Sequence, residues 1–363
     1  MKMKLFLTAS ALCLWAVPSL AIAHNRVEVA FVLDSTGSMG DLIDGAKQKI
    51  WSIANTIVDA NPQADVAMAI VTYRDRGDDY VVKSFPLSED VQGLFGKLSR
   101  IEADGGGDTP ESVNEALDKT INGLQWSDGD DVKRIVFLVG DAPPHMDYPQ
   151  ERQYPEILKT ALKKGIVVNA VQAGDDPETT ATWKEIAQFG HGHFIPIPED
   201  GGRVVIIETP YDAEILHLQR DLDETVIPYG SVEKKAELSG KMKDRAAASP
   251  SVALDSSAYY AKRKSAREVV TGDGDLLGDV RNDKVDLGKV AEADLPDELK
   301  TKSLDERKAW VAEKLAARSK IEDQIAALQV KRDAYVLEQK KNMPAKAASF
   351  DAAVEDALMS ELN

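Results

Sequence analysis

Short apolar runs alternate with stretches of helical spacing between residues 27 and 197. The apolar runs are typical of buried strands and lie at 27–33, 65–73, 80–85, 134–140, 166–173 and 193–197. Apolar residues three and four positions apart predict helices at 39–60, 88–101, 110–124, 151–164 and 177–189. Strands that alternate with helices indicate an α/β fold, a doubly wound and mostly parallel sheet with helices on both faces. The short turn between 65–73 and 80–85 predicts one antiparallel hairpin in that sheet.

The pattern changes after Gly201. A helix predicted at 210–226 either closes the sheet domain or leaves it, and further helices are predicted at 231–248, 255–270, 304–341 and 349–362. No strand is predicted beyond residue 231. We therefore divide the chain into a segment over 1–23, a sheet domain over 24–230 and an α-helical C-terminal region over 231–363.

The predicted helix at 304–341 carries an apolar line that Arg318 and Arg332 interrupt. The interruption favours packing within the chain over a coiled coil. Two interpretations stay open for the arginines. They pair with acids such as Asp221 or Asp223 or with a partner protein, or their stems pack while their charged ends reach water.

The first residues have the pattern of a signal peptide. A basic start at 1–4 precedes an apolar stretch at 5–17, and small residues at 21–23 predict cleavage after Ala23. We therefore expect a periplasmic or secreted protein. Cys13, the only cysteine, lies inside the apolar stretch, so the mature chain would have no thiol. That excludes cysteine nucleophiles, zinc-thiolate sites and disulfide scaffolds.

Composition narrows the classes of partner. The 363 residues carry a formal net charge of −17, which disfavours nucleic acid and anionic lipid and favours cations and basic partner surfaces. A hydrophobic content of 43% is enough for a packed core. After the first stretch no apolar run is long enough to cross a membrane, so we expect no integral membrane segment in the mature chain.

Oxygen-bearing side chains follow two of the predicted strands and a glycine-rich turn. Asp34 ends the first strand and is followed by Ser35, Thr36 and Ser38. Asp141 ends the strand at 134–140, and the stretch GGGDTP places Asp108 and Thr109 before Pro110, with Thr109 as the predicted N-cap of the next helix. Loops after the strands of an open α/β sheet are where such folds bind ligands. Carboxylates and hydroxyls are the ligands of Mg²⁺ or Mn²⁺.

These residues resemble the metal-ion-dependent adhesion site of von Willebrand factor A domains. That family's motif is Asp-x-Ser-x-Ser, a threonine on a second loop and an aspartate on a third. The resemblance implies that five residues ligate the metal, with Mg²⁺ as the ion and Mn²⁺ or Ca²⁺ as alternatives: Asp34, Thr36, Ser38, Thr109 and Asp141. Here Thr36 replaces the usual serine and Ala142 the usual glycine after the third-loop aspartate.

Several neighbouring residues have an ordinary interpretation beside a functional one. Ser35 and Asp108 are candidates to support the ligands or a metal-bound water, although an acid at a helix start is also common. His145 is a candidate partner contact or an ordinary surface-loop histidine. We interpret Asp273, Asp275, Asp279 and Asp283 as a solvated turn rather than a calcium loop, because the required glycine and terminal glutamate are missing.

The resemblance implies a non-enzymatic, exported binding module whose metal accepts a Glu or Asp from a partner protein. One alternative is a scaffold that acts through its helical C-terminal region. A metal-dependent hydrolase is a further alternative, but no general base is evident near Ser38. The sequence does not identify the partner.

Overall fold

The computed structural model describes residues 26–107, 109–202, 206–341 and 350–362. The predicted signal peptide and Asp108 lie outside these residues. Within them, no helix is both long and apolar enough to span a bilayer.

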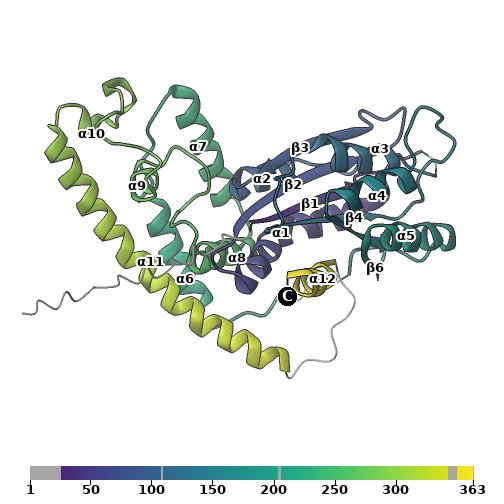
Figure 1. Cartoon of the computed structure of the whole chain (residues 1–363). Helices are drawn as coiled ribbons and strands as arrows, with labels where there is room; N and C mark the ends of the chain where they lie inside the picture. The colour runs from purple at the N-terminus through teal and green to yellow at the C-terminus, as the bar shows by residue number, and fades with distance from the viewer. Residues whose placement is uncertain (1–25, 108, 203–205, 342–349, 363) are drawn as a thin grey trace, which may run out of the picture.

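A six-stranded sheet forms the centre of the domain (Figure 1). Its strands are β1 (Arg26–Asp34), β2 (Asp65–Tyr73), β3 (Val82–Ser88), β4 (Val132–Gly140), β5 (Ile166–Ala173) and β6 (His191–Ile197). Their order is β3-β2-β1-β4-β5-β6. Every neighbouring pair is parallel except β2 and β3, which form the predicted antiparallel hairpin. The predicted fold class is confirmed.

Helices cover both faces of this sheet because successive strand side chains point to opposite sides. On β1, Val29 and Phe31 pack with α1 (Gly40–Ala60) and α2 (Val91–Leu98), whereas Ala30 and Val32 belong to a second core on the other face. That second core includes α3 (Val113–Asp118), the π-helical turn Lys119–Gly123, α4 (Tyr154–Lys163) and α5 (Pro177–Phe189). The sheet thus separates two apolar cores, one on each of its faces.

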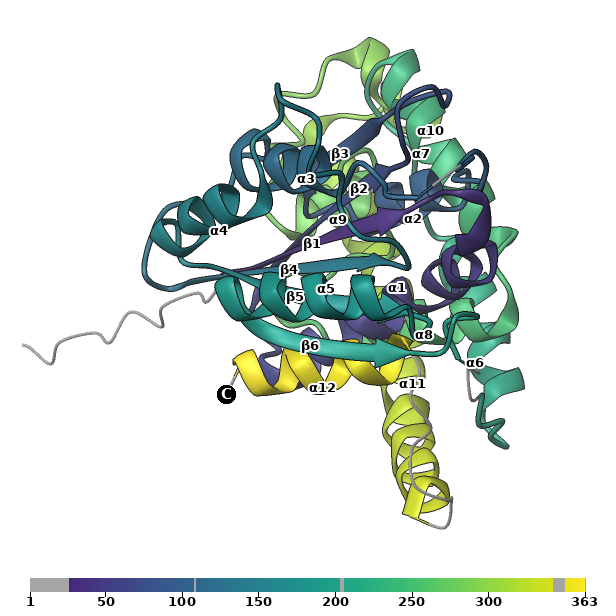
Figure 2. The same cartoon turned by 90° about the vertical axis from the view of Figure 1, so that its right-hand side faces the viewer.

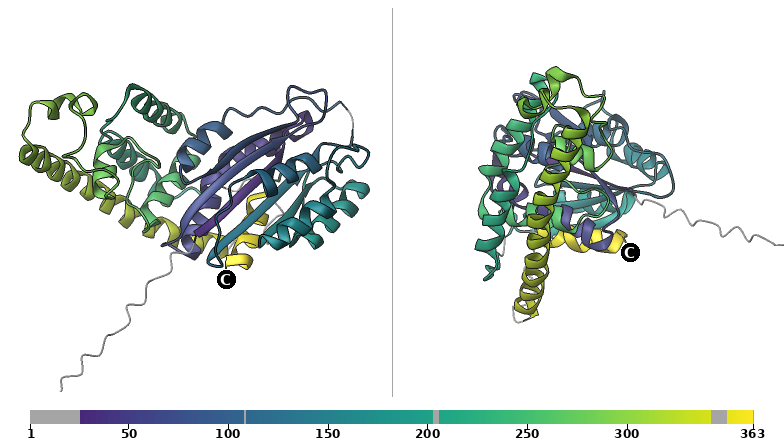
Figure 3. Two further views of the ribbon diagram at one scale, coloured as in Figure 1. Left: turned by 45° about the horizontal axis from the view of Figure 1, so that its top comes forward. Right: turned by 90° about the vertical axis from the view of Figure 1, so that its left-hand side faces the viewer.

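The C-terminal region is helical, as predicted. After α6 (Asp212–Asp223), which precedes residue 231, it comprises α7 (Val232–Ala246), α8 (Pro250–Lys262), α9 (Leu276–Arg281), α10 (Asp297–Lys300), α11 (Leu304–Lys341) and α12 (Phe350–Leu362). Helices α7, α9, α10 and the first half of α11 extend away from the sheet, and α11 runs along one side of the molecule (Figure 3). Leu276, Leu295 and Val311 belong to a separate small core in this extension.

Helix α12 returns to the sheet. It lies along β6 and α1 (Figure 2), and Val354, Ala357 and Leu358 are buried in the same core as α1. Asn169 Nδ2 on β5 donates a hydrogen bond to Glu361 Oε1 at 2.8 Å. Helix α8 packs beside α1 as well. The division at residue 230 remains a prediction, and the described contacts cross it.

The docking of α12 predicts a pH dependence of stability. Burial raises the pKa of Glu361 from 4.5 to about 7, and the hydrogen bond from Asn169 opposes the shift only in part. The folded state therefore holds this proton more tightly than the unfolded state does. As a result, the free energy of unfolding is highest below the unfolded-state pKa and falls as the pH rises through the folded-state pKa. Between pH 5 and 8, wild type should therefore lose roughly 2 to 3 kcal/mol more unfolding free energy than Glu361→Gln.

Urea unfolding at both pH values measures this difference. Glu313→Gln removes an exposed acid from α11 and should follow wild type. If the free energy of unfolding changes equally with pH in wild type and in Glu361→Gln, the raised pKa of Glu361 is not the cause of the pH dependence.

The structure corrects the expected limits of two helices and part of an expected turn. The helix expected from Pro110 begins at Val113 with Ser112 as N-cap, because Glu111 N instead donates to Pro143 O and 111–112 joins the neighbouring loop. The helix expected at 255–270 spans 250–262, because Arg263 adopts an extended backbone. The turn at 273–283 is solvated only in part: Asp273 and Asp283 are exposed, whereas Asp275 and Asp279 are buried and Asp275 caps α9.

The two arginines of α11 both pair within the chain, but with other acids than those expected. Arg318 is fully buried and binds Asp275 at 2.6 and 3.1 Å, and Arg332 Nε lies 3.0 Å from Asp212 Oδ1. Asp223 pairs with Arg245 instead. The interpretation in which the charged ends reach water is therefore wrong for Arg318.

Candidate functional site

The sheet topology places Asp34 and Asp141 at one edge. Asp34 is the last residue of β1, and Asp141 directly follows β4, its parallel neighbour. The carboxyl ends of adjacent parallel strands meet at the same edge, where open α/β sheets bind ligands. The two aspartates that the sequence singles out are therefore neighbours in space.

The first loop gathers three oxygen-bearing side chains. Asp34 Oδ1 accepts hydrogen bonds from Thr36 N at 2.9 Å and from Thr36 Oγ1 at 2.7 Å, and Thr36 Oγ1 lies 3.3 Å from Ser38 Oγ. Asp34 is fully buried, and its other oxygen, Oδ2, has no hydrogen-bond partner. A buried carboxylate oxygen without a donor is costly unless a cation or another donor reaches it.

Ser35 positions this loop. Its Oγ donates to Tyr73 O at 2.9 Å and lies 2.8 Å from Tyr80 Oη, while its carbonyl accepts from Arg74 Nε at 3.1 Å. Arg74 Nη2 also donates to Glu102 O at 2.9 Å, so one buried guanidinium connects the first and second loops. The Ser35 hydroxyl is thus engaged with the protein, and its predicted supporting role toward a metal remains a prediction.

Electrostatics agree with the convergence of the two aspartates. Burial raises the pKa of Asp34 to about 7; the hydrogen bonds from Thr36 oppose the rise and the negative charge of Asp141 adds to it. Tyr73, behind them on β2, has its pKa raised by burial and by the same two carboxylates. Negative charge is therefore concentrated at this edge of the sheet, and a cation bound there would stabilise the ionised carboxylates.

The second loop lies against the first through its backbone. Gly37 N donates to Gly105 O at 3.1 Å, and Asp104 N donates to Ser35 O at 3.0 Å. Gly105 and Gly106 have φ of 79° and 74°, a conformation that other residues rarely adopt, which explains the glycine-rich sequence. Thr109 is exposed, and no hydrogen bond among the described residues joins it to the other four predicted ligands.

Glu111, two residues after Thr109, is a site residue that sequence reasoning missed. It is only 3% exposed, and its Oε2 has no hydrogen-bond partner. Burial raises its pKa to about 9, and the charges of Asp34, Asp75, Asp78 and Asp141 contribute to the rise. The sequence signal that could have identified Glu111 is its position directly after the Thr-Pro pair of the same loop.

His145 belongs to a second polar cluster beside the site. Its Nδ1 lies 2.7 Å from Asp147 Oδ1 and its Nε2 lies 3.3 Å from Asp75 Oδ2, while its ring stacks on Tyr148. Asp75 also accepts from Ser112 Oγ at 2.7 Å. The surface-loop interpretation of His145 is wrong, since the residue is buried. Its role as a partner contact remains a prediction.

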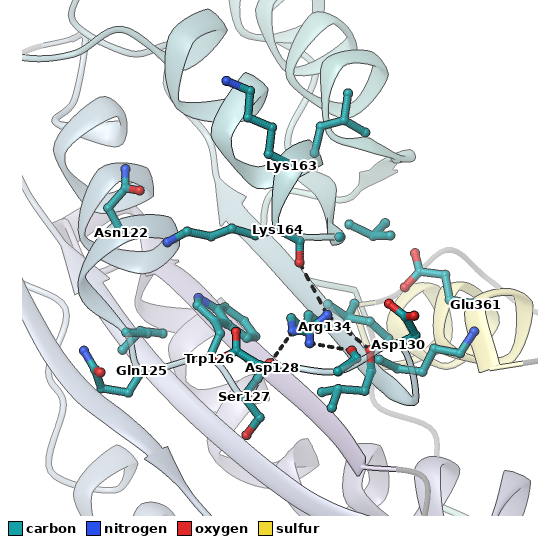
Figure 4. Close-up of a pocket in the computed structure, with 18 residues that line it drawn as sticks. Asn122, Gln125, Trp126, Ser127, Asp128, Asp130, Arg134, Lys163, Lys164 and Glu361 are labelled. Atoms are coloured by element: carbon teal, nitrogen blue, oxygen red, sulfur yellow. Dashed lines mark hydrogen bonds between the residues drawn. The ribbon is translucent and has the colours of Figure 1, made fainter.

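A hollow of about 990 Å³ lies at the opposite edge of the sheet, beside the start of β4 and the end of α4 (Figure 4). Arg134 at its centre donates to the carbonyls of Ser127 and Gly129 at 2.7 and 2.8 Å. Its guanidinium therefore holds the loop that precedes β4. None of the residues singled out from the sequence lines this hollow.

The donor set at the carboxyl edge fits a hard divalent cation. Two carboxylates and two hydroxyls come together there, one buried carboxylate oxygen lacks a donor, and all the ligand atoms are oxygens. Among the described residues, no three His, Cys, Asp or Glu side chains form a preassembled cluster. Like-charged carboxylates repel one another at ligand distances, so their close approach would accompany ion binding.

Known proteins are similar to the sheet domain. The family model of the von Willebrand factor A domain matches residues 28–192. A putative ariadne-like RING finger protein of Acanthamoeba polyphaga mimivirus is 31% identical over 119 residues, 33% of this chain and 11% of that protein. The alpha-protein kinase vwkA of Dictyostelium discoideum is 28% identical over 124 residues, 34% of this chain and 19% of the kinase. The matched part of this chain thus spans between a tenth and a fifth of the length of these relatives.

Two solved structures are similar to part of the chain at low identity. The crystal structure of the conserved hypothetical protein BatB from Bacteroides thetaiotaomicron is 19% identical with a TM-score of 0.37, over 47% of this chain and 90% of that one. The SpRpn10 von Willebrand factor A domain is 12% identical with a TM-score of 0.37, over 48% of this chain and 88% of that one.

Proposed function

We propose that this chain, which carries a von Willebrand factor A domain over residues 28–192, is an exported module that binds a partner protein through a divalent cation. Such domains commonly mediate protein interactions. Asp34, Thr36, Ser38, Thr109 and Asp141 would hold the ion, of the Mg²⁺ type. When bound, the ion would supply positive charge that an Asp or Glu of the partner can complete.

The observation that carries this proposal is the buried Asp34 carboxylate. Its Oδ1 orders Thr36 and, through it, Ser38, while its Oδ2 has no hydrogen-bond partner and Asp141 lies near enough to raise its pKa. A purely structural aspartate would be expected to have both oxygens satisfied. A cation-binding aspartate instead needs one oxygen available.

Two further parts of the proposal rest on the sequence. Export is supported by the basic, apolar and small-residue pattern of residues 1–23. A binding role without catalysis is supported by the sequence, in which no general base is evident near Ser38. A hydrolase screen of the purified protein, with Asp141→Ala as control, tests the second point.

Mg²⁺ should raise the melting temperature of the full chain, and Asp34→Ala should abolish the rise. Ligand at a hundred times its Kd stabilises a protein by about 2.7 kcal/mol, which corresponds to roughly 5–10 °C for a domain of this size. Differential scanning calorimetry in Mg²⁺ or in chelator measures the shift. Asp44→Ala, an exposed acid on α1, should respond to Mg²⁺ like wild type. No shift in wild type would refute metal dependence.

The partner itself can be sought by crosslinking the purified full chain to fractions of its source, with Mg²⁺ and with chelator. Partners captured only with Mg²⁺, and lost in Asp34→Ala, support the proposal. Capture that is the same with and without Mg²⁺ would favour the alternative of a scaffold acting through the helical C-terminal region.

A further inference from the structure

Glu111 has a buried carboxyl group beside the site, with one oxygen that no hydrogen bond satisfies. Its side chain is nine-tenths or more buried, and its Oε2 has no hydrogen-bond partner. A buried carboxyl group in such surroundings is destabilising unless it is protonated or meets a cation. Packing alone therefore does not explain why a carboxyl group is buried at this position.

The backbone of Glu111 is fixed against the third loop. Its N donates to Pro143 O at 3.0 Å, and its carbonyl accepts from His145 N at 3.0 Å, so 111 and 144 form a short parallel bridge. On the other side, Ser112 N donates to Arg74 O at 3.3 Å. Glu111 is thus held between the loop that begins at Asp141 and the segment that follows β2.

The side chain of Glu111 reaches the first loop. A Cβ atom built on Gly106 would lie 2.8 Å from Thr36 Cβ and 3.4 Å from Glu111 Oε1. Thr36 and the Glu111 carboxylate therefore flank the same glycine, and Gly106 leaves the space between them open. Thr109, from the same segment of chain, is exposed.

We propose that Glu111 is a direct ligand of the divalent cation at this edge, alongside Asp34 and Asp141. The inference rests on the metal binding proposed above and adds a residue that the adhesion-site motif does not contain. Together with Thr36, Ser38 and Thr109, the three carboxylates would supply six oxygens, the number that a Mg²⁺-type ion binds. A partner's carboxylate would therefore have to displace Glu111, which makes this residue an internal competitor for the partner's position.

Titration of the full chain with Mg²⁺ alone, by isothermal calorimetry, tests the assignment. Glu111→Gln keeps the size and burial of the side chain but removes its charge, and should raise the Mg²⁺ Kd at least about tenfold. Asp34→Asn should abolish binding. Glu102→Gln removes an exposed acid from the same loop and should bind Mg²⁺ like wild type. Circular dichroism confirms that each variant is folded.

A second measurement separates direct ligation from a general effect of charge. Water proton relaxation with Mn²⁺ counts the exchangeable waters on the bound ion, and Glu111→Gln should gain one relative to wild type. A Kd within twofold of wild type together with an unchanged water count would overturn the assignment of Glu111, while Asp34→Asn still shows whether the metal site exists. If wild type binds neither ion, the proposed metal dependence fails as well.

Discussion

Replacing Arg318 with methionine should lower the unfolding free energy by about 3–5 kcal/mol, the usual cost of leaving one partner of a buried ion pair alone. Arg318 is fully buried and donates to both carboxylate oxygens of Asp275. It also binds the hydroxyl and carbonyl of Thr225 at 2.8 and 2.6 Å. One guanidinium therefore joins α11, the start of α9 and the segment after α6.

Urea unfolding of the full chain, followed by circular dichroism, measures the loss. In the double variant Arg318→Met with Asp275→Asn, part of the stability should return, because no unpaired charge remains and the side-chain amide oxygen introduced at position 275 can still accept from Ile227 N. Arg332→Met breaks the more exposed pair with Asp212 and should cost about 1 kcal/mol. A loss below about 1 kcal/mol in Arg318→Met would show that the pair contributes little.

Leu358→Ala should have the next largest effect, about 2–5 kcal/mol, because it opens a cavity where α12 packs on α1. Leu358 is fully buried with Val354 in the core that α1 shares with the sheet. Hydrogen exchange should show faster exchange along α12 than in the strands, since the helix is held by this one face. Met359→Ala, at a side chain that is 39% exposed, is the matched control and should cost less than about 1 kcal/mol.

If Leu358→Ala unfolds with the midpoint of wild type, α12 contributes little to the stability of the domain. If the midpoint falls while exchange rises equally in every element, α12 is part of the global unfolding unit rather than a separately opening helix.

The sheet could be predicted because its signals are local. The runs that became β2, β5 and α5 are bounded by prolines, glycines or polar turns, and their observed limits coincide with the expected ones. The short helices α9 and α10 could not be predicted in the same way. Asp275 looks like a turn residue in sequence, and only its contact with Arg318, 43 residues away, makes burial of its carboxylate favourable.

The candidate site was predictable in part for the same reason. Asp34 and Asp141 follow recognisable strands, so topology alone brings them together. Thr109 and Glu111 are two residues apart on a loop whose path depends on its bridge to Pro144. Which of them turns inward is decided by that bridge and by the space at Gly106, and neither can be read from residue spacing.

The position of α12 has a consequence for how the protein is made. The hydrogen bond between Asn169 on β5 and Glu361 on α12 joins residues that are 192 positions apart in the chain. During synthesis, the apolar surface of α1 and β5 is therefore formed long before the helix that covers it leaves the ribosome. Contacts between residues so far apart in the chain slow folding. They also produce intermediates with exposed apolar surface, to which chaperones can bind. A core that closes this late would suit the export proposed for this chain, because the polypeptide could cross a membrane before it folds.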